Sequence, residues 1–380
     1  MQKRIKNKIK TFLRRTRFRL IALRAKKKGN TMKAAVLYGD EDFRYEDVAD
    51  PVVGDNDVKI QVKACGVCGS DIPRGLAGGA HYYPIILGHE FSGIVAEVGK
   101  NVTRVKVGDH VSGVPLKSCG NCPDCAKGNF SQCKNYSFIG SRDPGAYAEY
   151  CVVPETNAVK VDESIPFTSA AMFEPCTVSL HGVRVSGYTG GGTVAILGCG
   201  TIGLFALEWA KIFGAKKIVA FDISEEQLET AKRVGADVTI NTLDKDFKEQ
   251  AMAQTDGRGF DWVFETAGSV PTIQMSFELA GNKGHICFIG TPVKEMTFTK
   301  NLWENINRKE LTLTGSWMSG GTAPFPGDDW SLTAHYVSTG EMIIDPKFIY
   351  KKWALKDTAQ AFQDFKTPGK VKGRVMLVNE

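Results

Sequence analysis

The sequence lacks any long apolar run. No stretch of its 380 residues approaches the ~18 apolar residues that a transmembrane helix needs. In the N-terminal segment the longest apolar run covers only residues 20–23, which is too short for the core of a secretory signal. We therefore expect no membrane span and no secretory signal.

Acidic residues are missing from residues 1–31, which hold thirteen Lys or Arg. The remainder of the chain has 35 basic and 42 acidic residues, so its net charge is −7 although the whole chain carries +6. Nothing in this mildly acidic body suggests a nucleic-acid surface. We predict that residues 1–31 are a disordered extension, or a non-native start ahead of Met32. A basic amphipathic helix that binds a membrane surface or a polyanion is the alternative.

The pattern of apolar residues changes near residue 165, and a chain of this length usually holds two domains. Before that point, short alternating strands are separated by turn residues, which predicts a mostly β, partly open barrel. After it, apolar strands alternate with helical segments, which predicts a doubly wound parallel sheet. The last strand, within residues 371–378, is expected to return to the first domain. The fold class is therefore α/β.

Four of the ten cysteines, Cys119, Cys122, Cys125 and Cys133, lie within fifteen residues. This crowding suits one metal ion better than two disulfides, and it favours a reducing, cytoplasmic setting. Four thiolates close a tetrahedron around Zn²⁺ and leave no place for substrate, so we predict a structural zinc site. Free or paired cysteines are the alternative. A nucleic-acid-binding zinc ribbon is disfavoured, because the sequence lacks two separated CxxC pairs in basic surroundings.

A second set of metal donors is Cys68 in CGVCGSD, His89 and Glu90 in LGHEFSG, and Glu174 in FEP. One thiolate, one imidazole and one carboxylate leave a fourth position for water or an alcohol, as in catalytic zinc sites. Each residue alone is more often a packing or surface residue, and only their co-occurrence points to zinc. Whether Glu90 or Glu174 completes the set stays open, and Glu90 is also a candidate catalytic residue.

A glycine motif, Gly198, Gly200 and Gly203, follows the apolar strand TVAIL and opens a helix at Thr201 and Ile202. We expect the three glycines to allow a tight turn, a close approach to pyrophosphate, and close helix packing, respectively. Asp222 follows the next strand, nineteen residues after Gly203. Its carboxylate suits a ribose 2′-hydroxyl and repels a 2′-phosphate, so NAD is expected rather than NADP.

These motifs, in this order, resemble the zinc-containing medium-chain dehydrogenase/reductase family over about residues 32–380. The resemblance implies a GroES-like catalytic domain (residues 32–178 and 319–380), a Rossmann NAD-binding domain (residues 179–318), and an active site in the cleft between them. It also implies one catalytic and one structural zinc, and a homodimer or homotetramer. A zinc-free reductase would lack the GHE and four-cysteine elements, and a pure binding protein would bind no zinc.

Within the family, the segments CGSDIPRGLAGGAHYYPIILGHEFSG and IGSRDPGAYAEY are similar to polyol and polyol-phosphate dehydrogenases. The resemblance implies oxidation of a secondary alcohol of such a small molecule to a ketone. Many alcohol dehydrogenases have a proton-relaying His five residues after the zinc-binding Cys, but here that position is Pro73. Ser70 is therefore the candidate for proton transfer. Arg74 and Arg142 are candidate phosphate ligands, with a solvated surface charge as the alternative for each.

Overall fold

The computed structural model describes residues 29–292 and 294–379, which form two compact units. Unit 1 contains residues up to Glu174, Thr322–Ala334, and Ile349 onwards; unit 2 contains Pro175–Gly321 and His335–Phe348. The expectations for residues 1–28 lie outside the described part of the chain. None of the described helices is both long enough and apolar enough to cross a membrane.

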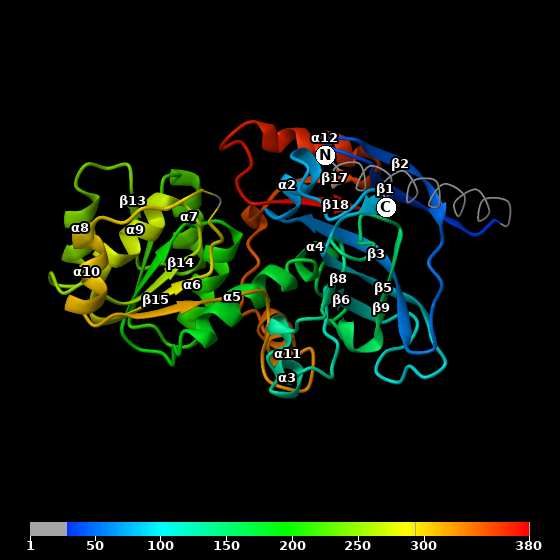
Figure 1. The fold of residues 1–380 in the computed structure, drawn as a ribbon, viewed down its shortest axis with the longest axis horizontal. Helices are drawn as coiled ribbons and strands as arrows, with labels where there is room; N and C mark the ends of the chain where they lie inside the picture. The colour runs from blue at the N-terminus through cyan, green and yellow to red at the C-terminus, as the bar shows by residue number, and fades with distance from the viewer. Residues whose placement is uncertain (1–28, 293, 380) are drawn as a thin grey trace, which may run out of the picture. The chain divides into compact units, whose positions relative to one another are not determined.

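Unit 1 is built mainly of short antiparallel strands (Figure 1). Its strands are β1 (Thr31–Leu37), β2 (Phe43–Ala49), β3 (Asp57–Val67), β4 (Ile85–Ile86), β5 (Glu90–Val98), β6 (His110–Gly113), β7 (Leu116–Lys117), β8 (Ser137–Phe138), β9 (Tyr150–Pro154), β10 (Ala158–Lys160), β17 (Ile349–Ala354) and β18 (Arg374–Val378). Its short helices are α2 (Asp71–Leu76), α3 (Pro123–Ala126), α4 (Phe167–Ala170) and α12 (Thr358–Gln363). Helices α5 (Phe173–Val185) and α11 (Asp328–Ser338) each begin in unit 1 and continue into unit 2.

The main sheet of unit 1 has the order β10-β6-β5-β3-β18-β17, and β9 also pairs with β3. The long strand β3 lies at its centre, because its inward side chains Val58, Ile60 and Val62 are fully buried in the unit's core. The C-terminal strand β18 pairs antiparallel with β3. The last strand of the chain thus returns to the first domain, as expected from its apolar sequence.

Unit 2 holds one parallel sheet of order β13-β12-β11-β14-β15-β16 with helices in the connections (Figure 1). Its strands are β11 (Thr193–Leu197), β12 (Lys217–Asp222), β13 (Val238–Asn241), β14 (Phe260–Glu265), β15 (Ala280–Phe288) and β16 (Thr312–Gly315). Its own helices are α6 (Thr201–Ile212), α7 (Glu225–Val234), α8 (Phe247–Ala253), α9 (Val270–Leu279) and α10 (Lys300–Arg308). The order reverses direction between β11 and β14, where doubly wound sheets bind dinucleotides.

One detail of unit 2 departs from the expectations. Residues 335–348 group with unit 2, whereas they were expected in the first domain. The physical reason is packing: Tyr336 lies edge-on to Trp209 at 5.5 Å, and Phe348 edge-on to Phe205 at 5.1 Å.

Candidate active site and metal centres

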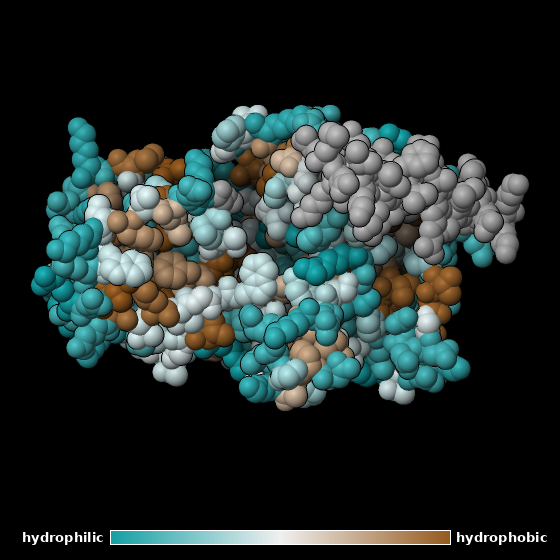
Figure 2. Space-filling model, viewed as in Figure 1, coloured by the Kyte–Doolittle hydropathy of each residue, from teal (hydrophilic) through white to brown (hydrophobic). Residues whose placement is uncertain are grey.

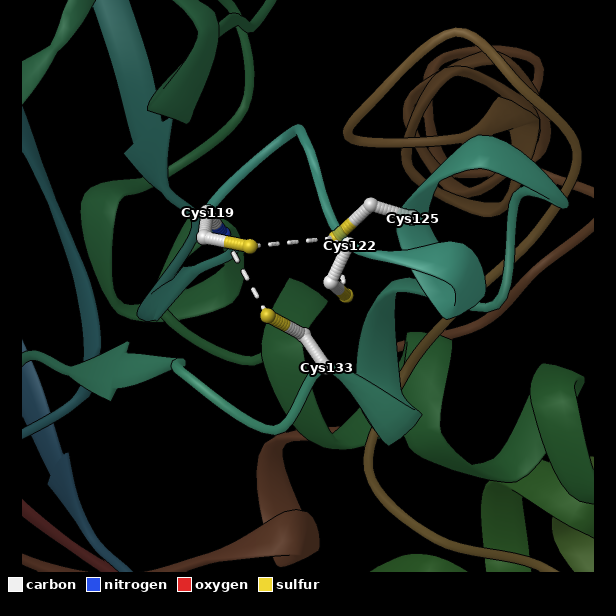
Figure 3. Close-up of side chains that lie close together, drawn as sticks. All are labelled: Cys119, Cys122, Cys125 and Cys133. Carbon is white, nitrogen blue, oxygen red and sulfur yellow. Dashed lines mark hydrogen bonds between the residues drawn. The ribbon is translucent and has the colours of Figure 1, made fainter.

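The four-cysteine loop brings its side chains to one point. Cys119 follows β7, Cys122 and Cys125 lie at the start and within α3, and Cys133 follows a short 3₁₀ turn. The sulfur atoms all lie within 4.8 Å of one another, and Figure 3 shows the four side chains converging. The Cys122–Cys125 and Cys119–Cys125 sulfur distances are 3.5 and 4.0 Å. A tetrahedron with Zn–S bonds of ~2.3 Å has edges of about 3.8 Å, so the geometry fits zinc.

The electrostatics of this loop favour a thiolate at Cys122 and a thiol at Cys125 when no metal is bound. Hydrogen bonding from the backbone N–H of Cys125 lowers the pKa of Cys122 to about 6, while burial raises the pKa of Cys125 to about 11. The backbone N–H of Cys119 donates to the Cys133 sulfur at 3.3 Å. Metal binding needs deprotonated sulfur, and a cation would replace the mutual repulsion of four thiolates with attraction.

Sheet topology assembles the second donor set. Cys68 directly follows β3, and His89 directly precedes β5. Because β3 and β5 are antiparallel neighbours, with Gly66 opposite Glu90, the end of one strand lies beside the start of the other. Ligand atoms of Cys68, His89 and Glu90 consequently lie within 4.8 Å of one another. A thiol, an imidazole and a carboxylate are a donor set that suits zinc with an open position.

Glu90 is fully buried and lies over Gly66, where a Cβ atom would come within 2.3 Å of its Oε2. Neither carboxylate oxygen has an aligned hydrogen bond, although Oε2 lies 2.9 Å from Nε of the buried Arg374. Burial raises the pKa of Glu90, and the charges of Arg374 and His89 oppose that rise. A buried carboxylate with so few partners fits a place beside a cation.

His89 is held against Asp71, which was not singled out from the sequence although it lies within the CGSD motif. Asp71 Oδ1 lies 3.5 Å from His89 Nδ1, and both residues are buried. Burial lowers the pKa of His89, but the charges of Asp71 and Cys68 outweigh it and raise that pKa well above its usual value. Ligand histidines commonly face a carboxylate through their second nitrogen, so this arrangement suits metal binding through Nε2.

Glu174, at the start of α5, is not part of the compact donor set formed by Cys68, His89 and Glu90. The charges of His89 and Glu90 nevertheless act on its carboxylate. Burial raises the pKa of Glu174 to about 7; the charge of His89 lowers it and that of Glu90 raises it. Of the two carboxylates, Glu90 is therefore the better placed to complete the ligand set in this structure.

Two arginines of unit 1 lie near the proposed proton route, and one of them contacts Ser70. The Arg74 guanidinium donates to Ser70 Oγ at 2.8 Å and to Asp71 Oδ1 at 3.1 Å. Arg142 is exposed and stacks over Tyr136 at 4.2 Å. Burial, followed by the charges of Arg142 and Arg74, lowers the pKa of His81, so both guanidinium groups act on one imidazole. His81 escaped the sequence analysis, because a single His in a loop carries no spacing signal.

In unit 2 the glycine turn runs from the end of β11 to the start of α6. Gly198 has φ +95°, and a Cβ on Gly203 would lie 1.8 Å from the Gly198 carbonyl oxygen. A Cβ on Gly200, in contrast, would meet nothing within 4 Å. Gly200 is the N-cap of α6, ahead of Thr201 and Ile202. The space beside its backbone is open. An anion is favoured at such a helix N-terminus.

Asp222 ends β12 beside this turn. Its Oδ2 accepts from the Cys199 backbone N–H at 2.7 Å, and its Oδ1 accepts from the Ser224 N–H at 2.9 Å. The carboxylate therefore links the glycine turn to the neighbouring strand. Each oxygen keeps a second lone pair that a ribose hydroxyl can use.

Comparisons with known proteins agree with this geometry. Residues 54–163 match the alcohol dehydrogenase GroES-like domain family, and residues 201–334 match the zinc-binding dehydrogenase family. Galactitol 1-phosphate 5-dehydrogenase of Escherichia coli (strain K12) is 38% identical over 88% of this chain and 95% of its own length. Sorbitol dehydrogenase of Bacillus subtilis (strain 168) is 34% identical over 69% of this chain and 75% of its own length.

Solved structures give the same result. The crystal structure of galactitol-1-phosphate dehydrogenase from Escherichia coli has a TM-score of 0.86 and 37% identity, covering 92% of this chain and 100% of that one. A zinc-binding dehydrogenase from Sinorhizobium meliloti, bound to NADP, has a TM-score of 0.82 and 31% identity, covering 92% and 99%. The chain therefore belongs to the zinc-containing medium-chain dehydrogenase/reductase family: it is a zinc- and nicotinamide-dependent oxidoreductase of the alcohol and polyol dehydrogenase type, acting on CH–OH groups.

Proposed function

We propose that the protein oxidises a secondary alcohol of a polyol phosphate to a ketone with NAD, and that galactitol 1-phosphate, which would yield tagatose 6-phosphate, is its substrate. The observation that carries the proposal is the pair of guanidinium groups, Arg74 on Ser70 and Arg142 on Tyr136, in the same unit as the Cys68–His89–Glu90 donor set. A phosphate needs cationic partners, and arginine binds it with directed, charge-assisted hydrogen bonds. The similarity to galactitol 1-phosphate 5-dehydrogenase over most of the chain supports the same choice.

In this proposal the residues divide the work. Cys68, His89 and Glu90, with Glu174 nearby, hold the catalytic zinc, and Cys119, Cys122, Cys125 and Cys133 hold the structural zinc. Zinc supplies a Lewis acid that lowers the pKa of a bound hydroxyl, and the nicotinamide ring accepts a hydride. Ser70 Oγ, fixed by the Arg74 guanidinium, accepts the hydroxyl proton and passes it to water. Pro73 supplies no titratable group to this route.

The cofactor proposal rests on unit 2. The N-terminus of α6, at Gly200, Thr201 and Ile202, takes the pyrophosphate, and Asp222 takes the ribose hydroxyls of NAD. The Asp222 carboxylate disfavours the 2′-phosphate of NADP by charge repulsion. The relative from Sinorhizobium meliloti is bound to NADP, so the preference of this chain for NAD should be measured against NADP.

Two further proposals concern the state of the protein. All ten cysteines lie in the described part of the chain and carry free thiols, which supports a reducing, cytoplasmic setting. A homodimer or homotetramer is supported by β16. This four-residue strand ends the sheet of unit 2, and three of its four residues are exposed. Among the described residues its ladder pairs only with β15, and unpaired edges favour association with another strand.

A substrate screen tests the proposal. NAD reduction is compared for galactitol 1-phosphate, sorbitol, xylitol, threonine and butanediol, with NADP in parallel. We expect the highest kcat/KM with galactitol 1-phosphate. A higher value with sorbitol or threonine would overturn the substrate assignment and favour a sorbitol/L-iditol or threonine dehydrogenase. Metal analysis of the purified protein tests the zinc sites, and we expect two zinc ions per chain.

A further inference from the structure

A buried tyrosine stands behind the proposed catalytic zinc site. Tyr147 is fully buried in unit 1, and its O–H donates to Asp71 Oδ2 at 3.1 Å. Its backbone N–H donates to the Leu87 carbonyl at 2.9 Å, and its carbonyl accepts from the Ala35 N–H at 2.8 Å. Hydrogen bonds therefore fix both the backbone and the hydroxyl of Tyr147, and the side chain has little freedom to move.

The ring of Tyr147 also fixes the backbone that leads into the GHE motif. It lies directly on Gly88, where a Cβ would come within 2.4 Å of ring carbon Cδ1. Gly88 has φ +96°, a conformation that favours glycine, and it immediately precedes His89. Tyr147 thus acts on His89 in two ways. Its ring packs on the backbone that precedes His89, and its hydroxyl binds the carboxylate that faces the His89 imidazole.

Asp71 distributes the effect of this hydrogen bond. Its Oδ2 accepts from Tyr147 and from the Cys68 backbone N–H at 3.3 Å. Its Oδ1 faces the Arg74 guanidinium at 3.1 Å and His89 Nδ1 at 3.5 Å. The fully buried carboxylate of Asp71 therefore contacts the side chain of one proposed zinc ligand, His89, and the backbone of another, Cys68. Without the phenol, Oδ2 would keep only the long bond from Cys68, so the orientation of the carboxylate towards His89 would be less firmly fixed.

We propose that Tyr147 is a positioning residue for the zinc site of Cys68 and His89, and that it acts through the carboxylate of Asp71. The inference rests on the proposed function, because it assumes that this donor set holds zinc. Outer partners of metal-binding histidines orient the ring, and losing one typically weakens metal binding by about 10–100-fold. Tyr147 lies one contact further out, so we expect the low end of that range.

The variant Tyr147→Phe isolates the hydroxyl, since it keeps the ring that packs on Gly88. In the full-length protein, competition with a chelator should show zinc binding at this site weakened by about tenfold. The four-cysteine site should be unchanged, which provides an internal reference. The matched control is Tyr38→Phe: Tyr38 is also buried in unit 1, and its O–H donates to Glu46 Oε1 at 2.5 Å, away from the metal donors. Zinc affinity in Tyr147→Phe within twofold of that in Tyr38→Phe would overturn the proposal.

A double-mutant cycle tests the route through Asp71. In an Asp71→Asn background, Tyr147→Phe should change zinc affinity by less than twofold. An undiminished tenfold effect there would show that Tyr147 does not act through Asp71. Replacing zinc with cobalt gives a readout apart from activity, because the absorption of Co²⁺ reports the geometry of its ligands; its spectrum should shift in Tyr147→Phe only. If the wild-type protein binds zinc at the four cysteines alone, the proposed function fails, whereas normal binding in Tyr147→Phe removes only this inference.

Discussion

In the proposed function, the exposed Arg142 helps to select a phosphorylated substrate. Its guanidinium is held over the Tyr136 ring and hydrogen-bonded to the Tyr136 hydroxyl at 3.0 Å, so it is oriented although it is exposed. An oriented guanidinium loses less freedom on binding an anion than a free side chain does. The geometry therefore favours a binding role over that of an ordinary surface charge.

Replacing Arg142 by Ala should raise KM for galactitol 1-phosphate roughly tenfold, the loss of one charge-assisted hydrogen bond. KM for unphosphorylated galactitol should change less than twofold. Steady-state kinetics with both substrates measure the difference. Arg104→Ala, which removes an exposed arginine of the same unit, is the control. Equal increases for the two substrates would remove Arg142 from the phosphate site.

Asp222 should determine which dinucleotide is used. The variant Asp222→Asn keeps an oxygen that can accept a backbone N–H but removes the negative charge. We expect the ratio of kcat/KM with NAD to kcat/KM with NADP to fall about tenfold, or ~1.4 kcal/mol. Asp244→Asn, at an exposed position of unit 2, should leave the ratio unchanged. An unaltered ratio in Asp222→Asn would contradict the role assigned to its charge.

At the scale of elements, the ends of neighbouring strands assemble the proposed catalytic zinc site. Cys68, His89 and Arg374 belong to the ends of three neighbouring strands, β3, β5 and β18. Antiparallel pairing places these ends together whatever loops connect them. The types of strand and helix follow from apolar periodicity and turn residues, so they could be predicted. The pairing of β18 with β3 could only be surmised, because the Arg374–Val67 hydrogen bond joins residues 307 positions apart.

Helix α6 carries a buried carboxyl group whose ionisation destabilises the folded protein at high pH. Glu208 is 2% exposed, and its Oε1 accepts from the Ile343 N–H at 2.7 Å. Burial raises the pKa of Glu208 to about 8; the Ile343 N–H and Lys211 oppose that rise, and Asp345 adds to it. The folded protein therefore keeps a proton that the unfolded chain releases near pH 4.5. The contribution of Glu208 to the free energy of unfolding is therefore fully present below about pH 4.5 and is lost as the pH rises towards 8.

Glu208→Gln should remove this loss, because the amide stays neutral at every pH. Relative to the wild type, we expect Tm at pH 9 to rise by roughly 2–4 °C, the shift that ~1 kcal/mol produces in a unit of this size. Near pH 5 the two proteins should melt alike. Thermal denaturation across pH 5–9 measures the effect, with the exposed Glu229→Gln as control. A constant difference at all pH values would show that ionisation of Glu208 is not its cause.

For the whole molecule, we propose that the exposed edge of unit 2 forms the contact between copies of the chain. Apolar residues reach the surface there at Trp303, Leu313 and Trp317, with exposures of 56%, 39% and 50%. Figure 2 shows that hydrophobic residues also appear at several places on the face drawn. An edge strand flanked by exposed aromatic residues suits a second copy of the same chain, since isologous contacts are the commonest in oligomers.

Leu313→Lys should weaken this association, because two copies would bring like charges to one edge. Light scattering coupled to size exclusion should give a dimer or tetramer for the wild type and a smaller species for the variant. Leu243→Lys changes an apolar residue of unit 2 that is 71% exposed, and it should leave the mass unchanged. A monomeric wild type would exclude the homo-oligomer.

The sequence by itself determined the chemistry that is available: the thiols, imidazole and carboxylates, the glycine turn, and the absence of a histidine at Pro73. These features are local, because ligand spacing and backbone freedom depend on a few neighbouring residues. Only the tertiary structure decided that Glu90 joins Cys68 and His89 while Glu174 lies further out. It alone brought Asp71, Tyr147 and Arg374 to them, because strand pairing and burial, which place these side chains, depend on residues far apart in the chain.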